Sequence, residues 1–497
     1  MGAEASRHKV EMGVRYINVT WEPHIGLPDS GGCMGSIARA AAKALLLLGA
    51  LSAGLPAQAE VLARYVVMGP GGAASARVIA SGATCPTIVV DGRRRAMQVR
   101  AKAETLAQRP TSSKPELSKP SAFPVTTCEA AIPQGAVRAV VAGRALPLRH
   151  GRVDRIVVVG DTGCRLKASD SAYQRCNDPK AYPFATVAAR AAAWKPDLIV
   201  HVGDYEYREN PCPEATDGCR GSPWGYGWDA WNADFFTPGA PLLAAAPLVL
   251  VRGNHENCAR AGQGWFRMLD ASPLTAGHDC NDAANDLVGD YSAPYAVPLG
   301  GREQIVVMDL AIAGNKPLKP GDPRRAQFRS AYEDLKALSA KSGMTFMATH
   351  KPTLGFTAED VGGKLTLLPG NQAMQSAFAA ADPSLFPPGV DVLLSGHVHL
   401  WQQVSFASAH PTQFIAGFSG TQEDVVPIPE TLPADATPAP GALVDHFSSW
   451  VDGFGYMTLE RAGRDRWDVK VWNLEGVVAN HCRIAGRRSV CDRPQVH

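Results

Sequence analysis

Apolar runs that end in glycine and polar residues dominate the chain between residues 155 and 399. The runs are RIVVVGD, DLIVHVGD, PLVLVRGNHE, TFMATH and DVLLSGHVH, and the helical stretches FATVAARAAAW and RAQFRSAYEDLKALSAKS lie between them. Buried strands that alternate with helices predict an α/β sheet domain. Because ligands gather at the carboxyl ends of the strands in such sheets, the polar tips are expected to form one site.

The tips carry oxygen and imidazole donors. They are Asp161, Asp204, Asn254, His255, His350, His397 and His399. Taken singly, each has an ordinary alternative: Asp161 suits a turn, Asn254 and His255 suit a helix cap, and a lone histidine is often structural. Together they form the mixed set that suits Zn, Mn or Fe. Two such metals about 3.5–4 Å apart, bridged by a carboxylate, clamp both oxygens of an in-line displacement.

The ordered motifs GDTG, GDYEY, GNHE, TH and GHVH closely resemble those of the calcineurin-like metallophosphoesterases. That superfamily includes purple acid phosphatases, whose exported bacterial branch this chain resembles, and protein serine/threonine phosphatases. The resemblance covers roughly residues 153 to 475. It implies a four-layer αββα sandwich of two mixed sheets flanked by helices, with a dinuclear centre at one edge.

The resemblance also implies roles for the residues of the motifs. Asp161 and His399 would bind the first metal, and Asp204 would bridge the two metals. Asn254, His350 and His397 would hold the second metal. His255 would stand near the leaving group and donate a proton to it, with Glu256 a weaker candidate to orient its ring.

Tyr207 and Arg208 combine features of two branches of the superfamily. Tyr207 stands where purple acid phosphatases carry the tyrosinate that ligates ferric iron, which implies Fe paired with Fe, Zn or Mn. If Tyr207 is instead a ring packed beside the site, a Zn or Mn pair is expected. Arg208 matches the arginine with which protein phosphatases contact substrate phosphate. Its alternative is a surface ion pair with Glu209 or Glu206.

These motifs predict a metal-dependent phosphoester hydrolase. The expected reaction is that of a phosphomonoesterase, with in-line attack by a metal-bound hydroxide. One rival is a phosphodiesterase acting on nucleotides or phospholipid head groups. Another is a secreted binding protein whose phosphoesterase body is a relic, although the complete ligand set argues against it. The formal net charge of +2 gives no indication of a nucleic-acid partner, and the oligomeric state stays open.

A loop rich in aromatic residues follows the second motif. Trp224, Tyr226 and Trp228 lie in NPCPEATDGCRGSPWGYGWDAWNADFF, where substrate would approach. They either bind the substrate by stacking on a nucleobase or sugar, or pack the loop as a local cluster.

The N-terminus predicts export. Basic residues Arg39 and Lys43, an apolar stretch from 44 to 55 and the cleavage sequence AQA form a secretory signal peptide after Met34, the expected start. No later run is apolar enough for a stable membrane span. We therefore expect residues 1–59 to be upstream residues and signal peptide, 60–150 a small all-β, sandwich-like domain, and 151–497 the metallophosphoesterase domain. The mature protein would be secreted or periplasmic.

Ten cysteines remain after Met34, an even number that suits disulfides in an exported protein. Sequence leaves the connectivity open. The simplest scheme pairs neighbours in order, as 85–128, 164–176, 212–219, 258–280 and 482–491.

Overall fold

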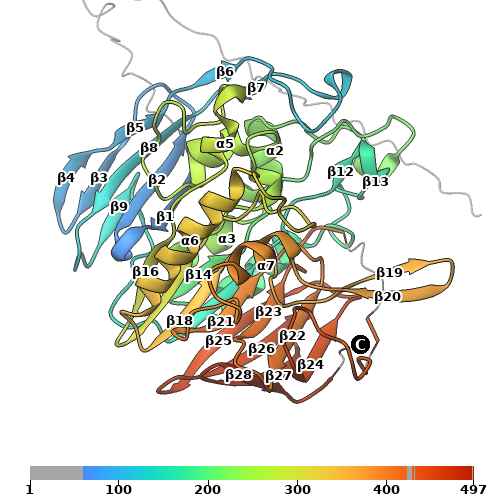
Figure 1. Cartoon of the computed structure of the whole chain (residues 1–497). Helices are drawn as coiled ribbons and strands as arrows, with labels where there is room; N and C mark the ends of the chain where they lie inside the picture. Colours follow the sequence, from blue (N-terminus) through green and yellow to red (C-terminus); the bar gives the residue numbers. More distant parts are fainter. Residues whose placement is uncertain (1–59, 423–427, 430, 495, 497) are drawn as a thin grey trace, which may run out of the picture. The chain divides into compact units, whose positions relative to one another are not determined.

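A computed structural model describes residues 60–497, apart from 423–427, 430, 495 and 497. The expected signal peptide and the residues before it lie outside the described residues. Strands and helices of the described chain are shown in Figure 1.

The larger of two main sheets contains the first three apolar runs. These runs form β11, β14 and β15, which pair in parallel as expected for strands buried on both faces. Strands from the C-terminal region extend the sheet on one side and strands from residues 60–132 extend it on the other. In order across the sheet, its strands are β28 (Arg488–Cys491), β27 (Val478–Ala485), β26 (Arg466–Asn473), β25 (Gly455–Gly463), β11 (Arg155–Val159), β14 (Leu198–His201), β15 (Leu248–Leu250), β1 (Val61–Met68), β2 (Ala74–Ala80), β8 (Thr126–Ile132) and β5 (Gln98–Ala101).

The second main sheet contains the last two apolar runs. Its inner strands β17, β18, β21 and β23 are parallel, whereas the strands that flank them pair antiparallel. In order, its strands are β16 (Tyr295–Gly300), β17 (Glu303–Val307), β18 (Met344–Ala348), β21 (Val390–Ser395), β23 (Thr412–Ala416), β22 (Trp401–Phe406) and β24 (Val444–Trp450).

Side chains that alternate along the strands build three buried layers. Val158 of β11 packs in one core cluster with Phe346 of β18, which places the two sheets face to face. Its neighbour Val157 points the other way, into a cluster with helix α1 (Phe184–Ala193). Each such side chain contributes about 1.5–3 kcal/mol when fully buried. Both faces of the central strands are therefore buried, which explains their unbroken apolar sequence.

Helices cover the outer face of each sheet and complete the expected αββα sandwich. Helices α1 (Phe184–Ala193) and α3 (Ala240–Ala245) pack on the larger sheet, and α6 (Arg324–Ser339) and α7 (Gln372–Ala379) pack on the smaller one. Further short helices are α2 (Trp228–Trp231), α4 (Gly262–Gly264), α5 (Asp286–Gly289), η1 (Pro70–Gly72), η2 (Pro115–Leu117), η3 (Ala168–Asp170), η4 (Asp217–Cys219), η5 (Asn232–Phe236), η6 (Asn254–Glu256), η7 (Trp265–Leu269) and η8 (Ala283–Asn285).

Residues 60–150 are rich in strands, as expected. Four of these strands extend the larger sheet, where β1 pairs with β15 through Val67 and Leu248. The others form small sheets, namely β10 (Arg144–Ala145), β9 (Ala139–Val141), β3 (Thr87–Val90) and β4 (Arg93–Ala96) in one, and β6 (Glu104–Leu106) with β7 (Ser121–Phe123) in another. That this segment is a separate domain stays a prediction.

Two hairpins lie beside the sandwich. The hairpin of β12 (Leu166–Lys167) and β13 (Ala172–Tyr173) follows the first motif, and that of β19 (Thr357–Val361) and β20 (Lys364–Leu368) projects from the body of the described chain (Figure 1). No helix among the described residues is long and apolar enough to cross a membrane.

All five disulfides expected from the order of the cysteines are present. Cys85–Cys128 closes a long loop, with a sequence separation of 43, and ties strand β8 to the segment before β3. Cys212–Cys219 closes a short one, with a separation of 7.

Replacing Cys85 and Cys128 together by serine is expected to lower the free energy of unfolding by about 2–5 kcal/mol, because the unfolded chain gains loop entropy. The matched control replaces Cys212 and Cys219, and its loss is expected to be roughly 1.6 kcal/mol smaller because its loop is shorter. Denaturant unfolding of the oxidised proteins measures both. Equal losses would contradict the loop-entropy explanation.

Candidate metal centre

The predicted site residues follow the carboxyl ends of strands from both sheets. Because the sheets pack face to face, these ends come together at one edge of the sandwich. From the larger sheet, Asp161 follows β11, Asp204 follows β14, and Asn254 and His255 follow β15; from the smaller sheet, His350 follows β18, and His397 and His399 follow β21.

The backbone at these tips is locally strained. Asp161, Asp204 and His397 have φ values of 53°, 58° and 70°, in the left-handed region that residues other than glycine seldom adopt. Such a conformation costs about 1–3 kcal/mol and tends to occur at functional sites. Gly203, with φ of 103°, is needed for another reason, because a Cβ there would lie 2.5 Å from Nδ1 of His350.

A first group of donor atoms surrounds the hydroxyl of Tyr207. This oxygen lies 3.1 Å from Oδ1 of Asp161, 2.7 Å from Oδ2 of Asp204 and 2.9 Å from Nε2 of His399. The four side chains are all buried. A phenol has only one proton and can donate it to only one of the two carboxylates. The group therefore has the chemistry of a site for a cation.

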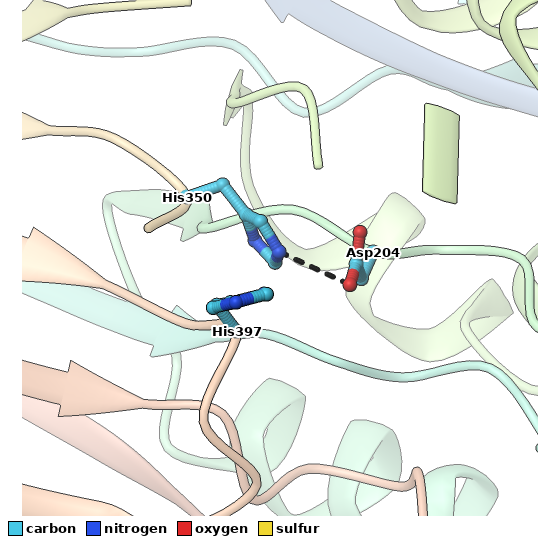
Figure 2. Close-up of side chains that lie close together, drawn as sticks. All are labelled: Asp204, His350 and His397. Carbon is cyan, nitrogen blue, oxygen red and sulfur yellow. Dashed lines mark ion pairs between the residues drawn. The ribbon is translucent and has the colours of Figure 1, made fainter. Parts of the chain in front are cut away.

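A second group of donor atoms shares Asp204 with the first. Nε2 of His350 lies 3.0 Å from Oδ2 of Asp204 and 3.1 Å from Oδ1 of Asn254. The ligating atoms of Asp204, His350 and His397 all lie within 4.8 Å of one another. Figure 2 shows the His350 and His397 rings on one side of the Asp204 carboxylate. Oδ2 of Asp204 thus lies between the two groups, where a bridging ligand would lie.

Hydrogen bonds on the far side of two histidine rings fix their tautomers. Nδ1 of His350 donates to the carbonyl of Val202 at 2.8 Å, and Nδ1 of His399 donates to the carbonyl of Gln422 at 2.8 Å. In the neutral rings, Nε2 therefore carries a lone pair that faces the carboxylates. A lone pair facing anionic oxygens is stable only with a cation or proton between them, and such carbonyl partners are typical of metal-binding histidines. The residues present fit two metal ions.

Charges around Asp204 keep it ionised. Burial by itself would raise the pKa of Asp204, but His350 and His255 outweigh burial and hold that pKa well below its usual range. Burial, followed by Asp204, raises the pKa of the Tyr207 hydroxyl well above its usual range. A tyrosinate at this position therefore requires a bound cation.

His255 lies beside the centre and is held by two residues that the motifs do not include. Its ring packs on that of Tyr207 with centroids 3.6 Å apart, and its Nδ1 lies 3.0 Å from Oε1 of Glu209. Nη2 of Arg260 lies 2.8 Å from the same ring nitrogen and also pairs with Glu209. Burial and Arg260 lower the pKa of His255 to about 4.

The role expected of Glu256 was wrong. Its carboxylate accepts hydrogen bonds from the backbone N–H groups of Asp204 at 3.0 Å, Tyr205 at 2.8 Å and Gly253 at 3.1 Å. Glu256 therefore holds the backbone around the Asp204 carboxylate, and Glu209 is the acid that contacts His255. Burial, with Asp204 beside it, raises the pKa of Glu256 to about 8.

Arg208 forms a buried ion pair instead of the surface ion pair that was one of its expected alternatives. Its Nε donates to Oδ1 of Asp234 at 2.5 Å, and its side chain is buried. Asp234 also accepts from the backbone N–H groups of Tyr207 at 2.8 Å and Cys164 at 3.0 Å. Arg208 thus anchors the loop that carries Tyr207, rather than pairing with Glu209 or Glu206 at the surface, and its contact with substrate phosphate stays a prediction.

The alternation of side chains along residues 207–209 explains why Glu209, rather than Arg208, contacts His255. Tyr207 and Glu209 both contact His255, whereas Arg208 between them contacts Asp234. Alternate side chains of an extended segment point to opposite sides. This spacing of two was the sequence signal that links Glu209, rather than Arg208, to the site. Arg260, which is six residues after Asn254, had no such signal.

The aromatic loop mainly packs. The hydroxyl of Tyr226 donates to Oε2 of Glu209 at 2.9 Å, and Trp228 packs on Phe236 with ring centroids 5.2 Å apart. Both are buried in the core cluster under α1 and α3, which favours the packing alternative, and their binding of substrate stays a prediction. Trp224 is half-buried with Lys119 over its ring, and its contact with substrate stays a prediction.

Replacing Arg208 by Met is expected to lower the free energy of unfolding by about 3–5 kcal/mol, because Asp234 would be left as an unpaired buried charge. Adding Asp234→Asn should restore part of the loss. Denaturant unfolding measures the stability, and KM of the folded variant is expected to stay near that of the parent. A raised KM with unchanged stability would show that Arg208 holds substrate after all.

Comparisons with known proteins bear on this site. Residues 154–400 match the family model described as calcineurin-like phosphoesterase, and no curated protein matches the chain. Among solved structures, PhoD is similar over 87% of this chain and 91% of its own, with 11% identity and a TM-score of 0.50, which supports the fold. Purple acid phosphatase PPD1 from yellow lupin (Lupinus luteus) is similar over 87% of this chain and 74% of its own chain, with 13% identity and a TM-score of 0.45. GAP50 of Plasmodium is similar over 68% of this chain and 90% of its own chain, with 11% identity and a TM-score of 0.36.

By its motifs, its two-sheet sandwich and its match to the family model, this chain belongs to the calcineurin-like phosphoesterases.

Proposed function

We propose that this protein is an exported phosphomonoesterase with a dinuclear metal centre. Membership of the family makes the chain a metal-dependent phosphoester hydrolase. The observation that carries the finer proposal is the position of Asp204 between two groups of donor atoms. The first site would comprise Asp161, Asp204, Tyr207 and His399, and the second Asp204, Asn254, His350 and His397. A binding protein with a relic body is not expected to keep both groups.

Bound metals in such a centre would supply Lewis acidity, which activates a water and neutralises charge on the phosphoryl oxygens. The protein would supply fixed geometry. Val202 and Gln422 hold the rings of His350 and His399 so that Nε2 faces the site. Glu256 holds the backbone of Asp204. These ligands would need little rearrangement to bind.

His255 is the residue that we propose moves a proton at the leaving oxygen. Its Nδ1 faces the carboxylate of Glu209, and Nη2 of Arg260 lies 2.8 Å from the second ring nitrogen, Nε2. That atom lies 3.9 Å from Oδ2 of Asp204, close to the centre. Glu209 and Arg260 would keep the ring in this orientation.

The position of the Tyr207 hydroxyl supports our proposal that the first site holds an iron ion. Its hydroxyl lies among the other three donors of that site rather than on the wall of a pocket. Ferric iron would favour the tyrosinate form, with Fe, Zn or Mn in the second site.

Export is supported by the disulfides. Five are present among the described residues, and disulfides form and persist outside the reducing cytoplasm. We propose that the protein is secreted or periplasmic.

The visible spectrum of the metal-loaded protein tests the role of Tyr207. A tyrosinate-to-ferric absorption band is expected, and Tyr207→Phe should abolish it. Tyr205→Phe is the matched control, since the hydroxyl of Tyr205 donates to the carbonyl of Val251 at 3.0 Å and that variant should keep the band. An active, colourless protein that contains only Zn or Mn would remove Tyr207 from the proposed ligands.

Turnover of para-nitrophenyl phosphate and of its bis ester tests the reaction. The monoester is expected to react faster. His397→Ala should lower kcat/KM for both by more than about a hundredfold and reduce the metal content, because the second site loses a ligand. His410→Ala is the control, since that buried histidine contacts Ser408.

Three outcomes would contradict parts of the proposal. Faster turnover of the bis ester would identify a phosphodiesterase. Full turnover by His397→Ala would overturn the second metal site. If the protein takes up no metal and hydrolyses neither ester after incubation with metal ions, the binding-protein alternative would be favoured.

A further inference from the structure

A pocket lies directly beside the second donor group. It has a volume of about 370 Å³, and His397 forms part of its wall. The rest of its lining comes from Asn315, from Val398 after β21, from the segment that leads into β19, and from the chain that runs from the end of β20 to the start of α7. We call it the His397 pocket.

Burial of the predicted ligands indicates that substrate reaches the centre from this side. Asp161, Asp204, Tyr207, His350 and His399 are buried. Only Asn254 and His397, both in the second group, are partly exposed. A phosphoester bound at the centre would therefore extend outward past these two residues, and the His397 pocket begins at the second of them.

The pocket wall combines apolar surface with uncharged polar groups. Pro352, Phe356 and Leu368 supply the apolar part, and Thr357 and Gln372 supply a hydroxyl and a carboxamide. Among the described residues that line it, His397 is the only one with an ionisable side chain. A charged group would lose its hydration here without gaining a partner of opposite charge, which is unfavourable.

We propose that the His397 pocket binds the leaving group of the substrate, and that it selects an uncharged, partly apolar alcohol of about the size of one ring system. This inference rests on the proposed function. The volume is near the lower end of the range for small-molecule sites. The apolar wall would bind the body of the alcohol, and Thr357 and Gln372 would bind its polar atoms.

Two monoesters that differ in one charge provide the test. Phenyl phosphate and 4-carboxyphenyl phosphate carry the same phosphate and the same ring, but the second places a carboxylate on the leaving group. The metal-loaded wild-type protein is expected to prefer phenyl phosphate by at least about tenfold in kcat/KM, since the carboxylate would be unpaired in the pocket. Similar kcat/KM for both would overturn the proposal.

A matched pair of variants locates the effect. Thr357→Lys places an ammonium at the pocket wall and should raise kcat/KM for 4-carboxyphenyl phosphate relative to phenyl phosphate by about tenfold or more. Thr366→Lys is the control. Thr357 pairs with Leu368, and Thr366 is two residues before Leu368 on the same face of the hairpin, but it is exposed and does not line the pocket. That variant should keep the wild-type preference.

The possible failures are distinguishable. If neither ester is hydrolysed by metal-loaded wild type, the proposed function fails and this inference with it. If both are hydrolysed but the ratio is the same in wild type, Thr357→Lys and Thr366→Lys, only the pocket assignment is wrong. Gln372→Lys provides a second variant at the wall, so that misfolding of Thr357→Lys would not remove the test.

Discussion

The carboxylate of Asp204 is the group on which the rest of the site depends. One of its oxygens lies within hydrogen-bonding distance of Tyr207 in the first donor group and of His350 in the second. Its other oxygen accepts from the backbone N–H of His255. The residue adopts a left-handed backbone conformation, and Glu256 compensates by accepting hydrogen bonds from the surrounding N–H groups. Burial of the two carboxyl groups of Asp204 and Glu256 is costly. They are stable here because cationic or hydrogen-bonding partners surround both of them.

A second tier of buried acids and arginines supports this arrangement. Asp234 joins Arg208 to the backbone of Tyr207, and Glu209 joins Arg260 to the ring of His255. Each acid thus fixes one residue beside the centre and neutralises one arginine. Buried charges are stable when paired and hydrogen-bonded in this way. The site therefore requires Arg208 and Arg260 for its structure, whether or not either of them contacts the substrate.

Local sequence patterns predicted an α/β sheet domain and placed the polar tips at one site, whereas the two-sheet sandwich was expected from the resemblance of the motifs. A strand buried on both faces must be apolar, and the first polar residues after it, such as Asp161 and His350, must lie at the sheet edge. The disulfides were also predictable, since each joins neighbouring cysteines. The roles of Arg208 and Glu209 were not, because Asp234 and Arg260 lie on other segments and only tertiary packing brings them in. The packing of Tyr226 and Trp228 depends on the same long-range contacts.

The origin of the proposed ligands has a consequence for how the protein would mature. Asp161, Asp204 and Asn254 come from one sheet, whereas His350, His397 and His399 come from the other. Ions that need ligands from both can bind tightly only after the two halves of the sandwich have docked. Binding of this kind draws the folding equilibrium toward the native state, by about 2.7 kcal/mol when the free ion is at a hundred times its dissociation constant. Acquisition of metal and completion of folding would then be a single coupled equilibrium, set by the supply of ions in the compartment where the chain folds.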